Sequence, residues 1–217
     1  MGRFLGRVAR ARYDGPAMST PATHDRPAFR RATEADAVAV AREIFLADQR
    51  VDMNALAGRL GVSRATLHRW VHTRERLLDT VLGQLAGEFF EEGLTHARQH
   101  PDDAVPALAH ALVSATSASP PLRGFVQREP ELALRLILGD GAVRRRAVAG
   151  VRALVQEAFP DEVDDLARFS EAVVDVTLAL EWATLAAGHE PSADRIAQIT
   201  RALLAGARAG ELGPAER

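Results

Sequence analysis

The sequence predicts an all-α protein, and three observations support this. Apolar residues recur at helical spacing along most of the 217 residues. No stretch alternates apolar and polar residues as a half-buried strand would. Proline or glycine marks nearly every break in the pattern, as at Gly139, Pro160, Gly188 and Pro191. We therefore expect helices joined by short turns, without an internal repeat.

The composition indicates a folded, cytoplasmic protein. Hydrophobic residues make up 47% of the chain, enough for one good core or two small domains. Cysteine is absent, which excludes disulfides, thiolate metal sites and a cysteine nucleophile, and favours a reducing compartment. No apolar run approaches the roughly 20 residues that a membrane span needs. We predict no membrane partner and no cofactor.

The first 27 residues are expected to form a flexible arm, since they contain Gly15, Pro16, Pro21 and Pro27. Their arginines are not followed by the apolar segment of a secretory signal. Met18 is an alternative start of translation, so whether the residues before it are made stays open.

A first helix is predicted over residues 33–47. Thr33 can cap its N-terminus, and Val38, Ala41, Ile44 and Phe45 form its apolar stripe. This stripe would pack across the two short helices that follow.

The next predicted helix is short and ends in a tight turn. Asp52 is its expected N-cap, and Gly61 can take the left-handed conformation that ends it. Its apolar residues share one face: Met53, Leu56, Ala57 and Leu60.

A second short helix begins after Ser63, which can cap it, and runs to Val71. It would bury Val62, Leu67 and Val71 and leave outward Arg64, Thr66, His68, Arg69 and Trp70. A donor-rich helix held by its neighbour suits insertion into the major groove of DNA. The pair therefore predicts a helix-turn-helix, although an ordinary surface helix can have the same spacing.

The charge distribution favours the DNA interpretation. Residues 1–78 contain 14 arginines against 8 acidic residues, whereas residues 79–217 contain 13 against 21. A basic end is expected where a protein meets backbone phosphate. We place the DNA-binding domain at residues 28–78 and a helical regulatory and dimerisation domain at 79–217.

A long helix should connect the two domains. Thr73 can cap it, Pro101 stops it, and a helix over residues 74–99 is about 39 Å long. The remaining helices are predicted over residues 106–118, 121–127, 130–138, 142–159, 164–187 and 192–209. The last two have apolar residues on more than one face, which favours a homodimer through this pair over a fully internal hairpin.

The segment GVSRATLHRWVHTRERLL, from Gly61 to Leu78, resembles the DNA-binding domain of TetR-family transcriptional regulators. The segment from Pro120 to Val148 resembles the regulatory domain of a TetR subgroup named for the QsdR regulators. The resemblance implies a homodimer that binds a palindromic operator, usually as a repressor. It also implies a small-molecule effector that fills a cavity in the C-terminal helical domain and releases the DNA.

By this resemblance, the residues expected to contact DNA are Asn54, Ser63, Arg64, Ala65, Thr66, His68, Arg69, Trp70, Thr73 and Arg74. For Arg64, contact with a base and contact with phosphate both stay open, and Arg69 is expected at phosphate or in solvent. The free N–H groups at the start of the long helix can receive a phosphate.

Three positions depart from the family pattern. His68 stands where the family has a phosphate-contacting tyrosine, Trp70 where it has a histidine or aromatic residue, and Val71 where it has a core phenylalanine. Val71 is smaller than phenylalanine and leaves the core of this small domain with less volume. A Trp70 side chain packed inward would replace the lost volume, and it would then not contact DNA.

A lipophilic effector pocket is expected between the middle helices, although each of its residues taken singly fits plain core better than pocket lining. The predicted lining is Phe89, Phe90, Leu122, Phe125, Val126, Leu136, Trp182 and Leu185. Few polar groups are expected there, with the Asp and Glu residues scattered over helix surfaces. Subgroup resemblance suggests an acyl chain or lactone.

Other clusters do not predict a site. His96 and His100 are one helical turn apart, but no third metal ligand is fixed near them, so no metal site is expected. The segment 139–141 follows no strand and is a turn instead of a phosphate loop. Arg144, Arg145 and Arg146 are expected in solvent or paired with Glu129 and Glu131.

The sequence thus predicts a ligand-responsive transcriptional regulator without catalysis. A small-molecule binding protein that has lost DNA binding is one alternative, motivated by His68 and Val71. A helical-bundle metalloenzyme is the other, and only the His96 and His100 pair supports it.

Overall fold

A computed structural model describes residues 31–160 and 162–210 of the chain. The arm expected over residues 1–27, and Met18 within it, lie outside the described residues. The described residues form α-helices and one short 3₁₀ turn, with no strand among them. The all-α prediction is therefore confirmed.

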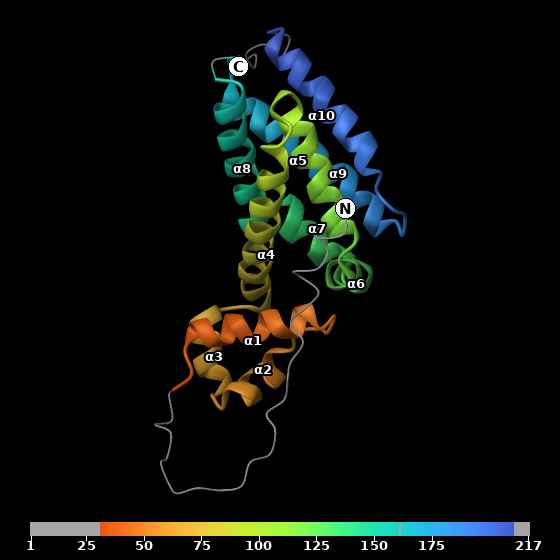
Figure 1. The fold of residues 1–217 in the computed structure, drawn as a ribbon. Coiled ribbons are helices and arrows are strands. Elements are labelled where there is room, and N and C mark those ends of the chain that lie inside the picture. Colours follow the sequence, from red (N-terminus) through yellow and green to blue (C-terminus); the bar gives the residue numbers. More distant parts are fainter. Residues whose placement is uncertain (1–30, 161, 211–217) are drawn as a thin grey trace, which may run out of the picture.

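The elements follow one another with short connections. They are α1 (Glu34–Leu46), α2 (Met53–Leu60), α3 (Arg64–Val71), α4 (Arg74–Ala97), η1 (Pro101–Asp103), α5 (Ala104–Ser117), α6 (Pro120–Arg128), α7 (Pro130–Leu138), α8 (Ala142–Ala158), α9 (Leu166–Ala186) and α10 (Ala193–Arg208). Figure 1 shows α1, α2 and α3 as a small unit at one end of α4, with α5 to α10 gathered around the rest of that helix.

The predicted caps account for where the first helices begin. The Thr33 N–H donates to the Asp36 carboxylate at 2.8 Å, and the Thr33 hydroxyl accepts from the Asp36 N–H. Asp52 accepts from the N–H groups of Asn54 and Ala55 at 2.9 and 2.8 Å. Such contacts satisfy N–H groups that lack a partner inside the helix.

Local contacts of the same kind set the helix ends in the helix-turn-helix. Gly61 ends α2 with φ of 64°, a left-handed conformation that glycine adopts without strain. Ser63 accepts from the Thr66 N–H at 3.0 Å, and Thr73 accepts from the Arg76 N–H at 3.1 Å. These short-range contacts agree with the predicted boundaries of α2, α3 and the start of α4.

Three boundaries differ from prediction by two residues, and one of them is the start of α9, which lies at Leu166 instead of residue 164. Helix α4 ends at Ala97 instead of residue 99, and a 3₁₀ turn that begins at Pro101 follows it. Helix α5 begins at Ala104, two residues before Pro106. Pro106 lies in the first turn of α5, where its missing N–H removes no intrahelical hydrogen bond.

The hydrophobic core is continuous across the predicted domain boundary. One cluster joins Ala41 and Leu67 of the small N-terminal unit to Leu78 of α4, Phe125 of α6 and Trp182 of α9. A second cluster lies among α4, α5, α8, α9 and α10. Because α4 belongs to both clusters, it ties the helix-turn-helix to the bundle by packing as well as by covalent connection.

The C-terminal helices do not form an isolated pair, since α10 packs against both α5 and α9. Within residues 31–160 and 162–210, no helix combines the length and hydrophobicity that a membrane crossing requires.

Candidate functional site

Helix α3 is divided into a buried face and an exposed face. Leu67 and Val71 are 1% and 6% exposed, and they fix the helix on the first core cluster. Of the ten predicted DNA contacts, seven are exposed and three, Thr66, Trp70 and Arg74, are half-buried; the exposed ones are Asn54, Ser63, Arg64, Ala65, His68, Arg69 and Thr73. Helix α3 therefore turns its polar face to the surface, while its apolar face is packed on the first core cluster.

Trp70 packs against the first core cluster while part of it stays exposed. Its neighbour Val71 is buried in the same cluster. The indole therefore adds apolar contact next to a small core residue, as the sequence analysis anticipated. A role for Trp70 at DNA stays a prediction.

His68 makes a contact within its own helix end. Its Nδ1 lies 2.6 Å from the His72 carbonyl oxygen, which can only accept, so Nδ1 carries the hydrogen. His72 has φ of 57°, a conformation unusual for a side-chain-bearing residue. In the neutral ring, Nε2 of His68 is then an acceptor, so donation to phosphate requires the imidazolium form.

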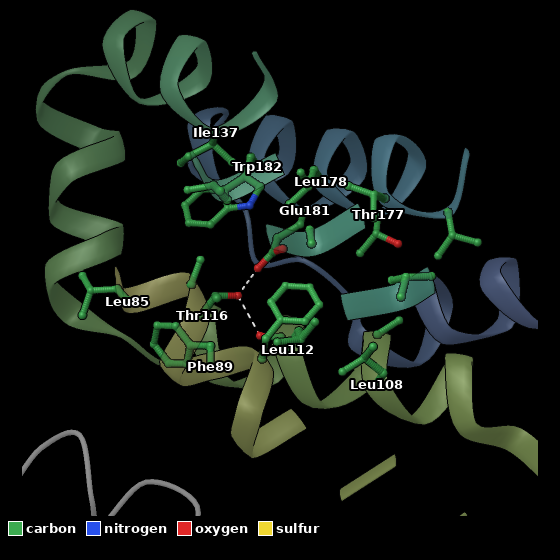
Figure 2. A pocket seen from close by; sticks show the side chains of 18 of the residues that line it. Leu85, Phe89, Leu108, Leu112, Thr116, Ile137, Thr177, Leu178, Glu181 and Trp182 are labelled. Atoms are coloured by element: carbon green, nitrogen blue, oxygen red, sulfur yellow. Dashed lines mark hydrogen bonds between the residues drawn. The ribbon is translucent and has the colours of Figure 1, made fainter. Parts of the chain in front are cut away.

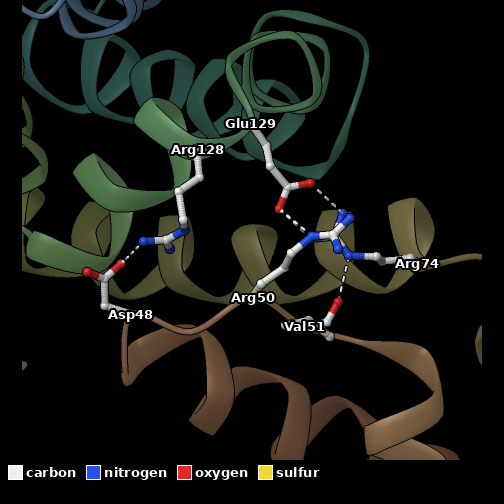
Figure 3. A network of polar contacts seen from close by, with 6 residues as sticks. All are labelled: Asp48, Arg50, Val51, Arg74, Arg128 and Glu129. Atoms are coloured by element: carbon white, nitrogen blue, oxygen red, sulfur yellow. Dashed lines mark hydrogen bonds and ion pairs between the residues drawn. The ribbon is translucent and has the colours of Figure 1, made fainter.

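Arg74 joins the small N-terminal unit to the bundle (Figure 3). Its Nε donates to the Val51 carbonyl at 2.6 Å, and its two terminal nitrogens donate to the Glu129 carboxylate at 2.7 and 2.6 Å. Arg50 reaches the same carboxylate at 3.5 Å, and Arg128 pairs with Asp48 at 2.8 Å. We name these contacts the interdomain network.

The interdomain network changes the expectation for Arg74. Its guanidinium, predicted at phosphate, is engaged by Glu129 between α6 and α7 and by the loop before α2. Hydrogen bonds from Arg74 hold the pKa of Glu129 below its usual range, against the opposing effect of burial. The Arg74 guanidinium is therefore already engaged within the protein, and its contact with phosphate stays a prediction. Arg74 and Glu129 are 55 residues apart, so no pattern of neighbouring residues in the sequence predicts this two-bond ion pair.

Replacing Glu129 by Gln should lower the free energy of unfolding by about 1–3 kcal/mol, because a partly buried Arg74 loses its charged partner. Urea denaturation at pH 7 measures this change. The exposed Glu131, two residues further along, supplies the control Glu131→Gln. Equal stability of the two variants would contradict a structural role for the interdomain network.

The arginine cluster of α8 pairs differently from one sequence expectation. Arg144 binds Asp175 of α9 at 2.8 Å, and Arg145 donates to the Asp140 carbonyl. The expected partner Glu129 is bound by Arg74 instead. The prediction of Glu129 and Glu131 as partners is therefore wrong, because α8 packs against α9 and brings Asp175 closer.

A mainly apolar cavity lies among the helices from α4 to α9 (Figure 2). Four of the predicted pocket residues line it: Phe89, Phe90, Leu122 and Trp182. The other four, Phe125, Val126, Leu136 and Leu185, are buried in the first core cluster and do not line this cavity. Further apolar lining comes from residues not singled out before, among them Leu82, Leu85, Leu108, Leu112 and Leu178.

Glu181 also lines the cavity, and it is only 2% exposed. This corrects the expectation that the acidic residues all lie on helix surfaces. Burial raises the pKa of Glu181 to about 8, and a hydrogen bond with Thr116 opposes that rise. The signal was present in the sequence, since Leu178, Trp182 and Leu185 surround Glu181 on one apolar side of α9.

The His96 and His100 rings lie 5.0 Å apart, and burial lowers the pKa of His96. Across the described part of the chain, no group of three or more His, Cys, Asp or Glu residues is placed to hold a metal ion.

Comparison with known proteins identifies the fold. Residues 102–205 match the family described as the tetracyclin repressor-like C-terminal domain. The chain is 25% identical in sequence to the R. erythropolis transcriptional repressor QsdR, from the TetR family, whose solved structure superposes with a TM-score of 0.72 over 79% of this chain and 94% of that one. The fold is that of a TetR-family repressor.

A second TetR-family structure shares the fold. It is the repressor AlkX from Dietzia sp. strain DQ12-45-1b, implicated in biodegradation of n-alkanes, at 21% identity. Its TM-score is 0.57 over 83% of this chain and 98% of that one. No curated protein matches the sequence. As a TetR-like transcriptional regulator, the protein has a helix-turn-helix in α2 and α3 and a C-terminal helical domain that contains the apolar cavity.

Proposed function

We propose that this TetR-family protein is a homodimeric, cytoplasmic repressor that reads a palindromic operator with α3. We further propose that a small, mainly apolar compound in the cavity releases it from DNA. The division of α3 carries the DNA part of this proposal. An eight-residue helix is only marginally stable alone, so the packing of Leu67 and Val71 holds its orientation.

The charges on α3 support contact with DNA. Arg42 and Arg59 pair with Glu88 and Glu43, at 2.7 and 3.5 Å. By contrast, Arg64 and Arg69 form no ion pair with any residue that the structure describes. Unpaired guanidinium groups on a protruding helix are available to guanine edges or phosphate oxygens.

Dimerisation is proposed through α9 and α10. Apolar residues of α9 recur at helical spacing on its outer side, with Ala179 and Ala183 exposed and Leu180 36% exposed. Ala172 and Val176 continue this row as half-buried residues. A second copy would cover this face, and light scattering coupled to size-exclusion chromatography should then give the mass of two chains.

The proposed coupling follows α4. Its residues Leu82, Leu85 and Phe89 line the cavity, and its first residue Arg74 belongs to the interdomain network. A compound that shifts α4 would change the spacing of the two α3 helices in a dimer. Half-sites lie one or more DNA turns apart, so such a change alters operator affinity.

The Arg64→Ala variant should bind the operator about 1–3 kcal/mol more weakly than the unchanged protein, because Arg64 loses its contact with base or phosphate. Gel-shift titration measures this on genomic fragments that the unchanged protein has selected from its source genome. The control is Arg152→Ala, an exposed arginine on α8 away from α3.

Unchanged affinity of Arg64→Ala would remove Arg64 from the interface. Failure of the unchanged protein to select any fragment, at low as well as at moderate salt, would instead support a small-molecule binding protein that has lost DNA binding.

A further inference from the structure

Four side chains with polar groups line the cavity in an otherwise apolar wall (Figure 2). Thr177, Glu181 and Trp182 come from α9, and Thr116 comes from α5 on the other side. All four side chains are at least nine-tenths buried. We name them the head-group cluster.

Two members of the head-group cluster have unused polar atoms. The Thr177 hydroxyl and the Trp182 indole N–H are buried and have no hydrogen-bond partner. A buried polar group without a partner costs about 1–3 kcal/mol, so such groups usually indicate a water or ligand site.

Thr116 indicates where the proton of the buried carboxyl lies. Its hydroxyl oxygen is 2.9 Å from the Leu112 carbonyl oxygen and also contacts the Glu181 carboxyl. The hydroxyl donates to one oxygen of the carboxyl, which lowers the pKa of Glu181 but does not offset the effect of burial. Because the pKa stays at about 8, the carboxyl keeps its proton at pH 7, and that proton lies on the oxygen that Thr116 does not contact.

In this neutral form, the head-group cluster offers complementary groups to a ligand. The second oxygen of Glu181 carries the O–H, which can donate and also accept, the Trp182 N–H is a donor, and the Thr177 hydroxyl can act as either. The wall around them contains no basic side chain. A carboxylate entering here would therefore have no countercharge, and an ammonium group would leave the Trp182 N–H facing a cation.

We propose that the head-group cluster selects an uncharged, mainly apolar compound whose single polar group both donates and accepts a hydrogen bond, such as an aliphatic alcohol or amide. This inference rests on the proposed role of the cavity as the effector site. It restricts the compounds that the cavity should accept, because ligands of equal chain length should bind with different affinities according to their head groups.

Four eight-carbon probes test the proposal by calorimetric titration of the full chain at pH 7: 1-octanol, octanamide, octanoate and octylammonium. The alcohol and the amide should bind. Octanoate should bind about 500-fold more weakly, since a carboxylic acid with a pKa near 4.3 must take up a proton at pH 7 to enter uncharged. Octylammonium should bind at least tenfold more weakly than the alcohol.

Two variants keep the test specific to the head-group cluster. Glu181→Gln retains an acceptor and a donor at the same place, so it should bind octanamide within a few-fold of the unchanged protein. Glu181→Leu removes both and should weaken binding at least tenfold. Circular dichroism melting shows whether each variant is folded.

The outcomes separate two kinds of failure. Equal binding of all four probes, or unchanged octanamide binding by a folded Glu181→Leu, would overturn the selection of head groups while the cavity remains a ligand site. Preferential binding of octylammonium would overturn it in favour of an ionised Glu181. Binding of none of the probes, together with no release of operator DNA, would contradict the proposed effector site itself.

Discussion

The Glu181→Gln variant should be more stable than the unchanged protein, by a margin that grows between about pH 5 and pH 8. Burial raises the pKa of Glu181 from 4.5 to about 8, so the folded state holds a proton that the unfolded chain releases. Over this window, stability falls as pH rises, by about 1.4 kcal/mol per pH unit. A glutamine at the same position does not ionise in this pH range, so the stability of the variant lacks this dependence on pH.

The full difference should be on the order of 5 kcal/mol above pH 8, and it should vanish near pH 4, where Glu181 is protonated in both the folded and the unfolded protein. Urea denaturation at a fixed protein concentration, repeated from pH 5 to pH 8.5, measures it. Glu171→Gln, an exposed change on the same helix, is the matched control and should follow the unchanged protein. Parallel pH profiles for Glu181→Gln and the control would show that Glu181 is not buried in solution.

The Leu67→Ala variant should lose about 2–5 kcal/mol of stability and with it operator binding. Leu67 is 1% exposed and is the largest side chain by which α3 packs on the first core cluster, apart from the half-buried Trp70. A cavity at this point loosens a helix whose orientation depends on packing.

Thermal melting followed by circular dichroism, with gel-shift titration on the selected fragments, measures both effects. Leu67→Met keeps the volume of the side chain and should cost less than about 1.5 kcal/mol while DNA binding is retained. Operator affinity that is unchanged in Leu67→Ala would mean that α3 does not depend on this contact to meet DNA.

Much of the helix-turn-helix could be predicted without a structure because its signals are local. Asp52, Gly61 and Ser63 act on backbone groups within a few residues of themselves, so the residue type and its position suffice to place the ends of α2 and α3. The buried face of α3 follows from helical spacing alone, as Leu67 and Val71 show.

The cavity could be predicted only in part. Sequence spacing marks Phe125 and Phe89 alike as buried aromatic residues, yet only Phe89 lines the cavity, while Phe125 packs edge-on against Phe45 of α1 at 5.5 Å. Burial depends on the face of a helix, whereas cavity lining depends on which other helix that face meets. That second property involves residues far apart in the chain.

By itself, the sequence determined the all-α class, the capped helices and the polar face of α3, because periodicity and caps involve neighbours along the chain. Only the tertiary structure decided that Arg74 binds Glu129 and that Glu181 faces Thr116 within an apolar cavity. These pairs join helices 55 and 65 residues apart, so their chemistry exists only once the helices have packed.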